Sequence, residues 1–157
     1  MSRKPIVGGN FKCNGTKAFV EQHAKLLKTL PADNAVEVYV APTALSLDYL
    51  KKELADTKIM VAAQNCYFQP SGAWTGEISV ELLKDFGIVD VVIGHSERRR
   101  KMGETSEDSA KKAARALEFG LRVYFCIGET LEEREAGNVD KVNFEQLAEL
   151  KKLLKEE

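Results

Sequence analysis

The chain has 157 residues, of which 44% are hydrophobic and 30% are charged, and its formal net charge at pH 7 is −1. A chain of this length can bury a sizeable core within one domain. The charge balance argues against a nucleic-acid or anionic-membrane partner. The one basic run, at 98–101, is interpreted as a solvated or ion-paired helix surface. No apolar run approaches the roughly 20 residues that a membrane-spanning helix needs.

The ends and the cysteines of the chain bear on its location in the cell. The N-terminus leads directly into a strand signal without the apolar stretch of a signal peptide, and the C-terminus carries no sorting motif. Cys13, Cys66 and Cys126 are odd in number, widely spaced and without a CxxC pair, which is typical of reduced thiols. We therefore expect a cytoplasmic protein without a disulfide framework or a metal site.

Strand and helix signals alternate along the chain. The apolar patterns predict strands at 5–11, 36–40, 58–63, 89–93 and 121–127, and helices at 16–30, 45–54, 80–85, 105–119, 130–136 and 142–154. The strands are apolar on both faces, as in a parallel sheet covered by helices. The sequence therefore predicts a single α/β domain of about five βα units.

Two local patterns stand out within this alternation. Thr105, with Asp108 three residues later, predicts a capped helix start, and Gly120 predicts the end of the same helix. The segment 64–77 is long for a connection in a compact domain, and such loops are usually functional or make contacts.

Polar residues directly follow two of the predicted strands. Asn10-Phe11-Lys12 ends the first, and His95, one of two histidines in the chain, follows the fourth through Gly94. Parallel α/β folds place catalytic groups at these carboxyl ends. Because residues i and i+2 of a strand point to one face, we expect Asn10 and Lys12 to lie side by side. A structural histidine and a solvated lysine remain the alternatives on this pattern alone.

Taken together, the motifs resemble the triosephosphate isomerase family. The matching segments are Gly8-Gly9-Asn10-Phe11-Lys12, Gln64-Asn65, Gly72-Ala73-Trp74-Thr75-Gly76-Glu77, Ile93-Gly94-His95-Ser96-Glu97-Arg98-Arg99 and Cys126-Ile127-Gly128-Glu129. The resemblance implies a (β/α)8 TIM barrel, a fold of about 250 residues, of which this chain supplies five βα units as a partial barrel. The implied missing parts are the loop after strand six, which carries the catalytic glutamate, and the glycine-rich turns that hold the substrate phosphate.

The resemblance also implies a reaction of glycolysis and gluconeogenesis, the interconversion of dihydroxyacetone phosphate and glyceraldehyde 3-phosphate, without cofactor or metal. A base removes a proton beside the carbonyl, and electrophiles stabilise the enediolate oxygen. This family is itself the standard example of a neutral histidine electrophile at a helix start, so that catalytic role for His95 is taken from the family. By the same resemblance Lys12 is catalytic and meets the anionic substrate, and Asn10 helps to bind it.

Residues around His95 are expected to support the site. Glu97 could be a base by its residue type, but an ion pair with Lys12 is the preferred interpretation, and Ser96 lies beside it in the motif. We expect Arg98 and Glu104 to form a structural ion pair.

The segment 64–77 is implied to be a dimer loop. In the family this loop protrudes into the partner subunit near its active site, which would make the protein a homodimer. Thr75 and Trp74 lie in the loop, and Cys13 lies where the loop of a partner would dock. A disordered surface loop is the alternative, although the apolar area of Trp74 argues against it.

Five units would leave the first and last strands without an outer neighbour. Such apolar edges favour pairing between copies, swapping or aggregation. We expect the 157-residue chain alone to be inactive or nearly so, because it has electrophiles but no recognised base or phosphate cradle. A non-catalytic partial-barrel scaffold that self-assembles, and a chain complemented by a separate chain, remain open alternatives.

Overall fold

The computed structural model describes residues 3–31 and 35–154, in which strands and helices alternate. The strands are β1 (Ile6–Asn10), β2 (Glu37–Ala41), β3 (Met60–Ala63), β4 (Asp90–Ile93) and β5 (Arg122–Phe125). The helices are α1 (Lys17–Leu27), the 3-10 turn η1 (Ala44–Ser46), α2 (Leu47–Glu53), α3 (Val80–Asp85), α4 (Ser96–Lys101), α5 (Ser106–Glu118), α6 (Leu131–Glu135) and α7 (Val139–Lys151). No helix of the described residues is long and apolar enough to cross a membrane.

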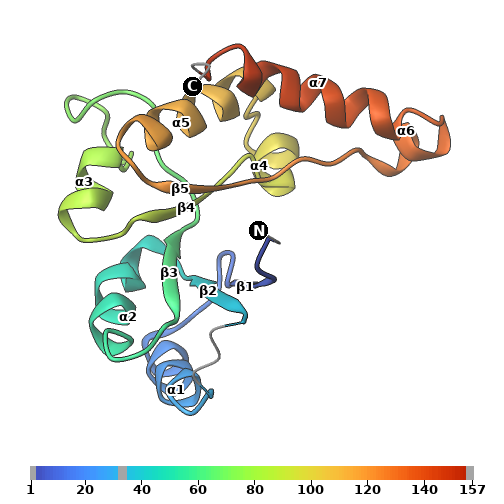
Figure 1. The fold of residues 1–157 in the computed structure, drawn as a ribbon. Helices are drawn as coiled ribbons and strands as arrows, with labels where there is room; N and C mark the ends of the chain where they lie inside the picture. The colour runs from blue at the N-terminus through green and yellow to red at the C-terminus, as the bar shows by residue number, and fades with distance from the viewer. Residues whose placement is uncertain (1–2, 32–34, 155–157) are drawn as a thin grey trace.

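The strands form one parallel sheet in the order β1-β2-β3-β4-β5. The sheet curls into part of a barrel, with α1, α2, α3 and α5 along its outer side and the concave side open (Figure 1). Helix α7 packs against α5 in a further layer. The predicted α/β class and the partial TIM barrel of about five βα units are confirmed.

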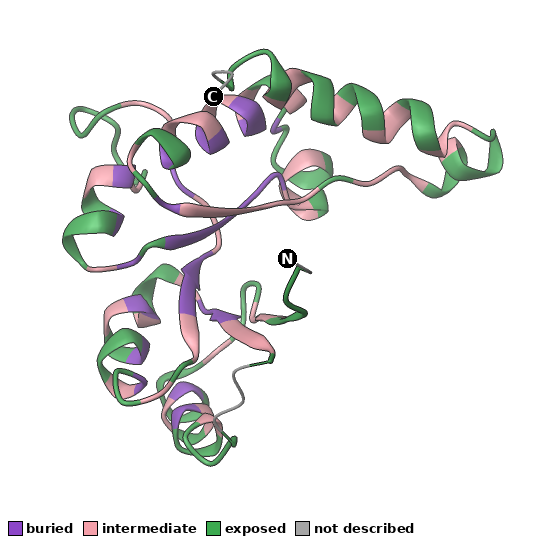
Figure 2. Ribbon diagram, in the orientation of Figure 1, coloured by how far each residue is buried: buried purple, intermediate pink, exposed green. Residues whose placement is uncertain are grey.

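Alternating strand residues separate the two faces of the sheet. Val40, Val61 and Val91 face the helices and join the main buried cluster, whereas neighbours such as Ala62 and Val92 belong to a smaller cluster on the concave face. Burial is therefore concentrated on the central strands and on the inner sides of the helices that cover them (Figure 2). Burial of β3 and β4 on both faces explains why these strands read as continuous apolar runs.

Side chains on the concave face connect β2 directly to β5. Arg122 Nη1 donates to Glu37 Oε2 at 2.6 Å, and Arg122 Nε donates to Asp90 Oδ1 at 2.6 Å. The rings of Tyr39 and Tyr124 stack with their centroids 4.1 Å apart. Because β3 and β4 lie between β2 and β5 in the sheet, these contacts span the concave face and hold the curl.

Most predicted boundaries lie within three residues of the observed ones; α1 and α7, for example, each end three residues before the predicted end. The helix predicted at 45–54 is divided between η1 and α2, and α7 begins at Val139, three residues before the predicted start. The predicted cap of α5 is confirmed, since Thr105 Oγ1 accepts from Asp108 N and Asp108 Oδ2 accepts from Thr105 N, each at 3.0 Å.

Candidate active site at the carboxyl ends of the strands

A cavity of about 400 Å³ opens where the carboxyl ends of the strands meet. Asn10 and Lys12 reach it from the end of β1, and His95 and Glu97 reach it from the turn after β4. Of the predicted site residues, these four line one cavity together with Cys13, whereas Ser96, Trp74 and Thr75 do not line it.

Lys12 is held in an unusual backbone conformation. Its φ angle is 54°, a left-handed conformation that is uncommon outside glycine. Its N–H donates to Asn10 Oδ1 at 2.8 Å, and its carbonyl accepts from Gln64 Nε2 at 2.9 Å. Asn10 and Lys12 were predicted to lie side by side as residues i and i+2 of one strand. That reason is wrong, because β1 ends at Asn10 and Lys12 lies in the following turn. The contact between the two residues is instead the hydrogen bond from the Lys12 backbone N–H to the Asn10 side chain.

Lys12 and Glu97 form the predicted ion pair. The Nζ of Lys12 lies 3.0 Å from Glu97 Oε1. The hydrogen bond from Lys12 holds the pKa of the Glu97 carboxyl below its usual range. Glu97 is therefore an ionised partner of Lys12 and a weakened base.

His95 is the N-cap residue of α4, and its side chain is 24% exposed. The backbone N–H of Glu97 donates to His95 Nδ1 at 3.3 Å. An Nδ1 that accepts belongs to a neutral ring with its hydrogen on Nε2. His95 can then donate one hydrogen bond from Nε2. Ser96 begins α4, is exposed and is not among the residues that line the cavity.

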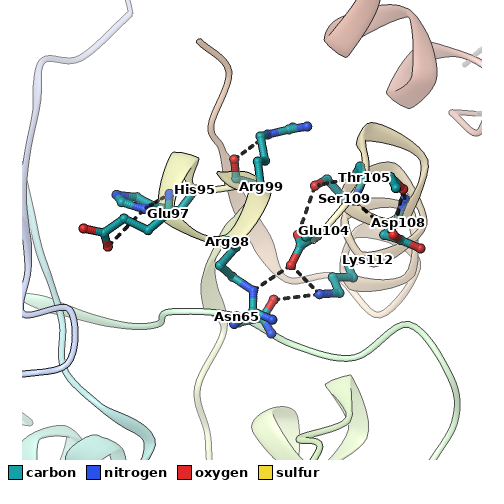
Figure 3. Close-up of polar contacts among 11 residues, drawn as sticks. Asn65, His95, Glu97, Arg98, Arg99, Glu104, Thr105, Asp108, Ser109 and Lys112 are labelled. Atoms are coloured by element: carbon teal, nitrogen blue, oxygen red, sulfur yellow. Dashed lines mark hydrogen bonds and ion pairs between the residues drawn. The ribbon is translucent and has the colours of Figure 1, made fainter. Parts of the chain in front are cut away.

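A buried polar cluster lies behind α4. Figure 3 shows Arg98, Lys112 and Ser109 converging on the carboxylate of Glu104, whose side chain is 3% exposed. Arg98 Nε and Lys112 Nζ lie 2.6 and 2.7 Å from Glu104 Oε2, which confirms the predicted Arg98–Glu104 pair. Burial would raise the pKa of Glu104, but the hydrogen bonds from Lys112 and Arg98 outweigh it and hold that pKa below its usual range. The cluster joins the start of α5 to α4.

Two residues of this region were missed by sequence reasoning. Gln64 Nε2 donates to the carbonyls of Lys12 and Ala41, at 2.9 and 2.8 Å, and so fixes the turn after β1. Its position directly after the third strand was the available signal. The interpretation of 98–101 as a solvated or ion-paired surface is wrong for Arg99, which is partly buried and bonds to backbone carbonyls.

The segment 64–77 has a defined conformation. Tyr67 N donates to Ile78 O at 2.8 Å, which closes the base of the segment, and the rings of Tyr67 and Trp74 lie 5.3 Å apart. Trp74 and Thr75 are exposed. The role of this loop in a dimer, with docking at Cys13, stays a prediction.

Within the described residues, no group of three or more His, Cys, Asp or Glu side chains is arranged to hold a metal ion. Cys13, Cys66 and Cys126 are free thiols, and Cys66 is buried. The cavity is lined by the cationic side chains of Lys12 and Arg98, by His95, and by carboxylate, amide, hydroxyl and thiol groups from Glu77, Glu97, Asn10, Gln64, Asn65, Thr43, Cys13 and Cys66.

Comparisons with known proteins identify the family of the chain. The family model described as triosephosphate isomerase matches residues 5–157. The chain is 50% identical over 144 residues to a chloroplastic triosephosphate isomerase from Fragaria ananassa, an alignment that covers 92% of this chain and 46% of that protein. It is 45% identical over 152 residues to a triosephosphate isomerase from Neurospora crassa, covering 97% of this chain and 61% of that protein. The chain thus spans about half of the length of these relatives, and it belongs to the triosephosphate isomerase family.

Proposed function

We propose that this chain supplies the electrophilic half of an active site that interconverts dihydroxyacetone phosphate and glyceraldehyde 3-phosphate. The observation that carries the proposal is the convergence of Lys12, His95 and Asn10 on one cavity, with His95 Nδ1 occupied by the N–H of Glu97. The family relationship supports the same reaction.

In the proposed reaction a carbonyl oxygen of the substrate gains negative charge as a proton leaves the neighbouring carbon. The Nε2–H of His95 donates to that oxygen, and the ammonium of Lys12 stabilises the developing charge. Fixed donors are effective here because they need little reorganisation as the charge develops. Asn10 keeps Lys12 in place through its bond to the Lys12 amide.

The carbon base must come from elsewhere. Glu97 is the carboxylate next to His95, but Lys12 binds it and its lowered pKa makes it a poor proton acceptor. By family resemblance, the base and the phosphate-binding turns belong to units beyond the fifth. We therefore propose that the 157-residue chain by itself has little or no isomerase activity, since both groups supply transition-state stabilisation.

The test is isomerase turnover of the purified chain, measured beside a His95→Gln variant prepared identically. We expect both preparations to match the blank. Mixing the chain with a separately produced polypeptide carrying family units six to eight should then restore turnover, but only with the parent chain. Turnover by the parent chain alone that falls in the His95→Gln variant would contradict the proposed need for a base from outside these residues.

Self-association without catalysis is the second candidate, and the exposed strand edges favour it. Ile6 and Val7 of β1 are 42% and 59% exposed, and every residue of β5 is only partly buried. The outer edges of β1 and β5 have no neighbouring strand in the sheet, and such edges are templates for pairing with another copy. Light scattering across a range of chain concentrations tests this candidate, and a monomer at every concentration would contradict it.

A further inference from the structure

We propose that Arg99 is a positioning residue for His95, because its guanidinium and its backbone together fix both peptide carbonyls that flank the histidine. This inference rests on the proposed function only in taking His95 as the group that faces the substrate. Figure 3 shows His95 directly before the short helix α4 and Arg99 within that helix.

Arg99 contacts the backbone on both sides of His95, whose carbonyl also accepts from Arg98 N at 2.8 Å. Its Nε donates to the carbonyl of Gly94 at 2.7 Å, which belongs to the peptide bond preceding His95. Its backbone N–H donates to the carbonyl of His95 itself at 3.2 Å. Its Nη1 and Nη2 donate to Ser106 Oγ at 2.9 Å and to the carbonyl of Cys126 at 3.2 Å. One side chain therefore connects the ends of β4 and β5 and the start of α5 to the turn that presents the histidine.

Helix α4 needs such an anchor. It has only six residues, and isolated helices of this length are not stable in water. The ring of His95 takes its orientation from the Glu97 amide of the same helix, at 3.3 Å. Any rotation of α4 relative to β4 would thus move the ring and its donor together.

The chemistry at Arg99 differs from that of an ordinary ion pair. In the part of the chain that the structure describes, no carboxylate lies within ion-pair distance of Arg99, whereas the adjacent Arg98 pairs with Glu104. Burial lowers the pKa of the Arg99 guanidinium. Arg99 is thus a partly buried cation bound to neutral oxygens, and the planar guanidinium that reaches them has a geometry that a lysine ammonium cannot reproduce.

Gly94 fits the same arrangement. Its φ angle is 75°, and a Cβ added there would lie 2.7 Å from Arg99 Nη2 and 3.0 Å from the carbonyl oxygen of Cys126. The guanidinium therefore occupies the space that a side chain at position 94 would need. The glycine before the histidine and the arginine after it act as one unit.

The test uses nuclear magnetic resonance of the 157-residue chain, so it does not depend on isomerase activity. The nitrogen shifts of the His95 ring report its tautomer, and the exchange rate of the Glu97 amide hydrogen reports the bond to Nδ1. His23 is the only other histidine, so a His23→Gln variant assigns the signals. In Arg99→Met we expect Glu97 exchange to accelerate about tenfold, as for the loss of one hydrogen bond, and the His95 ring to populate both tautomers.

Arg100→Met is the matched control. Arg100 lies next in the same helix and also donates to a backbone carbonyl, that of Glu129, at 2.6 Å. This variant should leave the His95 ring and the Glu97 amide unchanged. Arg99→Lys retains the positive charge without the planar guanidinium, so its Glu97 exchange rate and His95 tautomers should match those of Arg99→Met.

Three outcomes would overturn the proposal. The first is a folded Arg99→Met chain with unchanged His95 and Glu97 signals. The second is full recovery in Arg99→Lys, which would show that charge alone suffices. The third is failure of both Arg99 variants to fold, which would make Arg99 a determinant of the fold rather than of the histidine. None of these outcomes bears on the proposed isomerase reaction, which the turnover assay tests separately.

Discussion

The buried cluster around Glu104 offers a sharp test of the stability of this fold. Replacing Glu104 with Gln keeps the size of the side chain but removes its charge. Lys112, whose side chain is 7% exposed, would then be a buried cation without an anionic partner. Breaking a buried ion pair in this way costs about 3–5 kcal/mol.

The structure places the expected loss at the lower end of that range. Lys112 retains a hydrogen bond to Asn65 Oδ1 at 3.2 Å, and Arg98 is 34% exposed and can be hydrated. We therefore expect the free energy of unfolding to fall by about 3 kcal/mol in Glu104→Gln. For an m value of about 2 kcal/mol/M, the urea midpoint would shift down by about 1.5 M.

The assay is urea unfolding followed by far-ultraviolet circular dichroism at pH 7. Glu107→Gln is the matched control, because Glu107 also pairs with a lysine, Lys111 at 2.6 Å, but on the exposed surface of α5. The free energy of unfolding of Glu107→Gln should lie within about 0.5 kcal/mol of the parent value. A double variant, Glu104→Gln with Lys112→Met, should regain part of the lost stability, because no unpaired charge remains buried.

The pH dependence of stability tests the same buried cluster. The pKa of Glu104 in the folded state is held below its unfolded value of about 4.3. The ionised carboxylate therefore adds to the free energy of unfolding above about pH 4.3, and this added stability is lost as the pH falls through the folded-state pKa. The stability difference between parent and Glu104→Gln should therefore narrow toward pH 3. The reasoning is refuted if Glu104→Gln loses no more stability at pH 7 than Glu107→Gln.

Three further variants and a labelling experiment test other parts of the structure. Thr105→Ala removes the side-chain cap of α5 and should lower the free energy of unfolding, measured in urea, by about 1 kcal/mol. Thr105→Ser keeps a capping hydroxyl and should retain most of the parent stability. Gly8→Ala would place a Cβ 2.3 Å from the ring of Tyr39, so overpacking should cost about 1–3 kcal/mol; an unchanged urea midpoint would contradict this contact. A thiol reagent should modify exposed Cys13 quickly and Cys66 only on unfolding, because burial raises the pKa of the Cys66 thiol to about 12. Equal rates for the two thiols in the folded chain, read by mass spectrometry, would contradict that burial.

Sequence patterns predicted the parts of this fold that local physics controls. The cap at Thr105 was readable because its partner lies three residues away, and the buried strands were readable because both of their faces are apolar. The start of α7 was placed too late because Gly137-Asn138 was interpreted only as a break, although Asn138 is the N-cap residue and Asp140 is an acidic residue of the first turn, and both are signals of a helix start. The prediction thus failed where a break signal and a helix start adjoin.

Contacts between distant segments could not be predicted in the same way. Arg122 and Glu37 are 85 residues apart, and only the curl of the sheet brings them within 2.6 Å. Arg99 sits in a run of basic residues that is typical of a solvated helix, and its burial depends on where β5 ends. The family resemblance supplied site residues that pattern alone left open, but not the side chains that hold them.

The electrophilic side of the site is organised entirely within the described residues. Lys12 is fixed on one side by Asn10 and on the other by Gln64, and both of these residues belong to the first three βα units. His95 is fixed by the turn after β4 and by Arg99, which reaches no further than the end of β5. Each of these restraints is a hydrogen bond with a backbone group within the described residues. In the proposed reaction, a base brought to this cavity would therefore meet Lys12 and His95 already held by these hydrogen bonds, as electrostatic stabilisation of an enediolate requires.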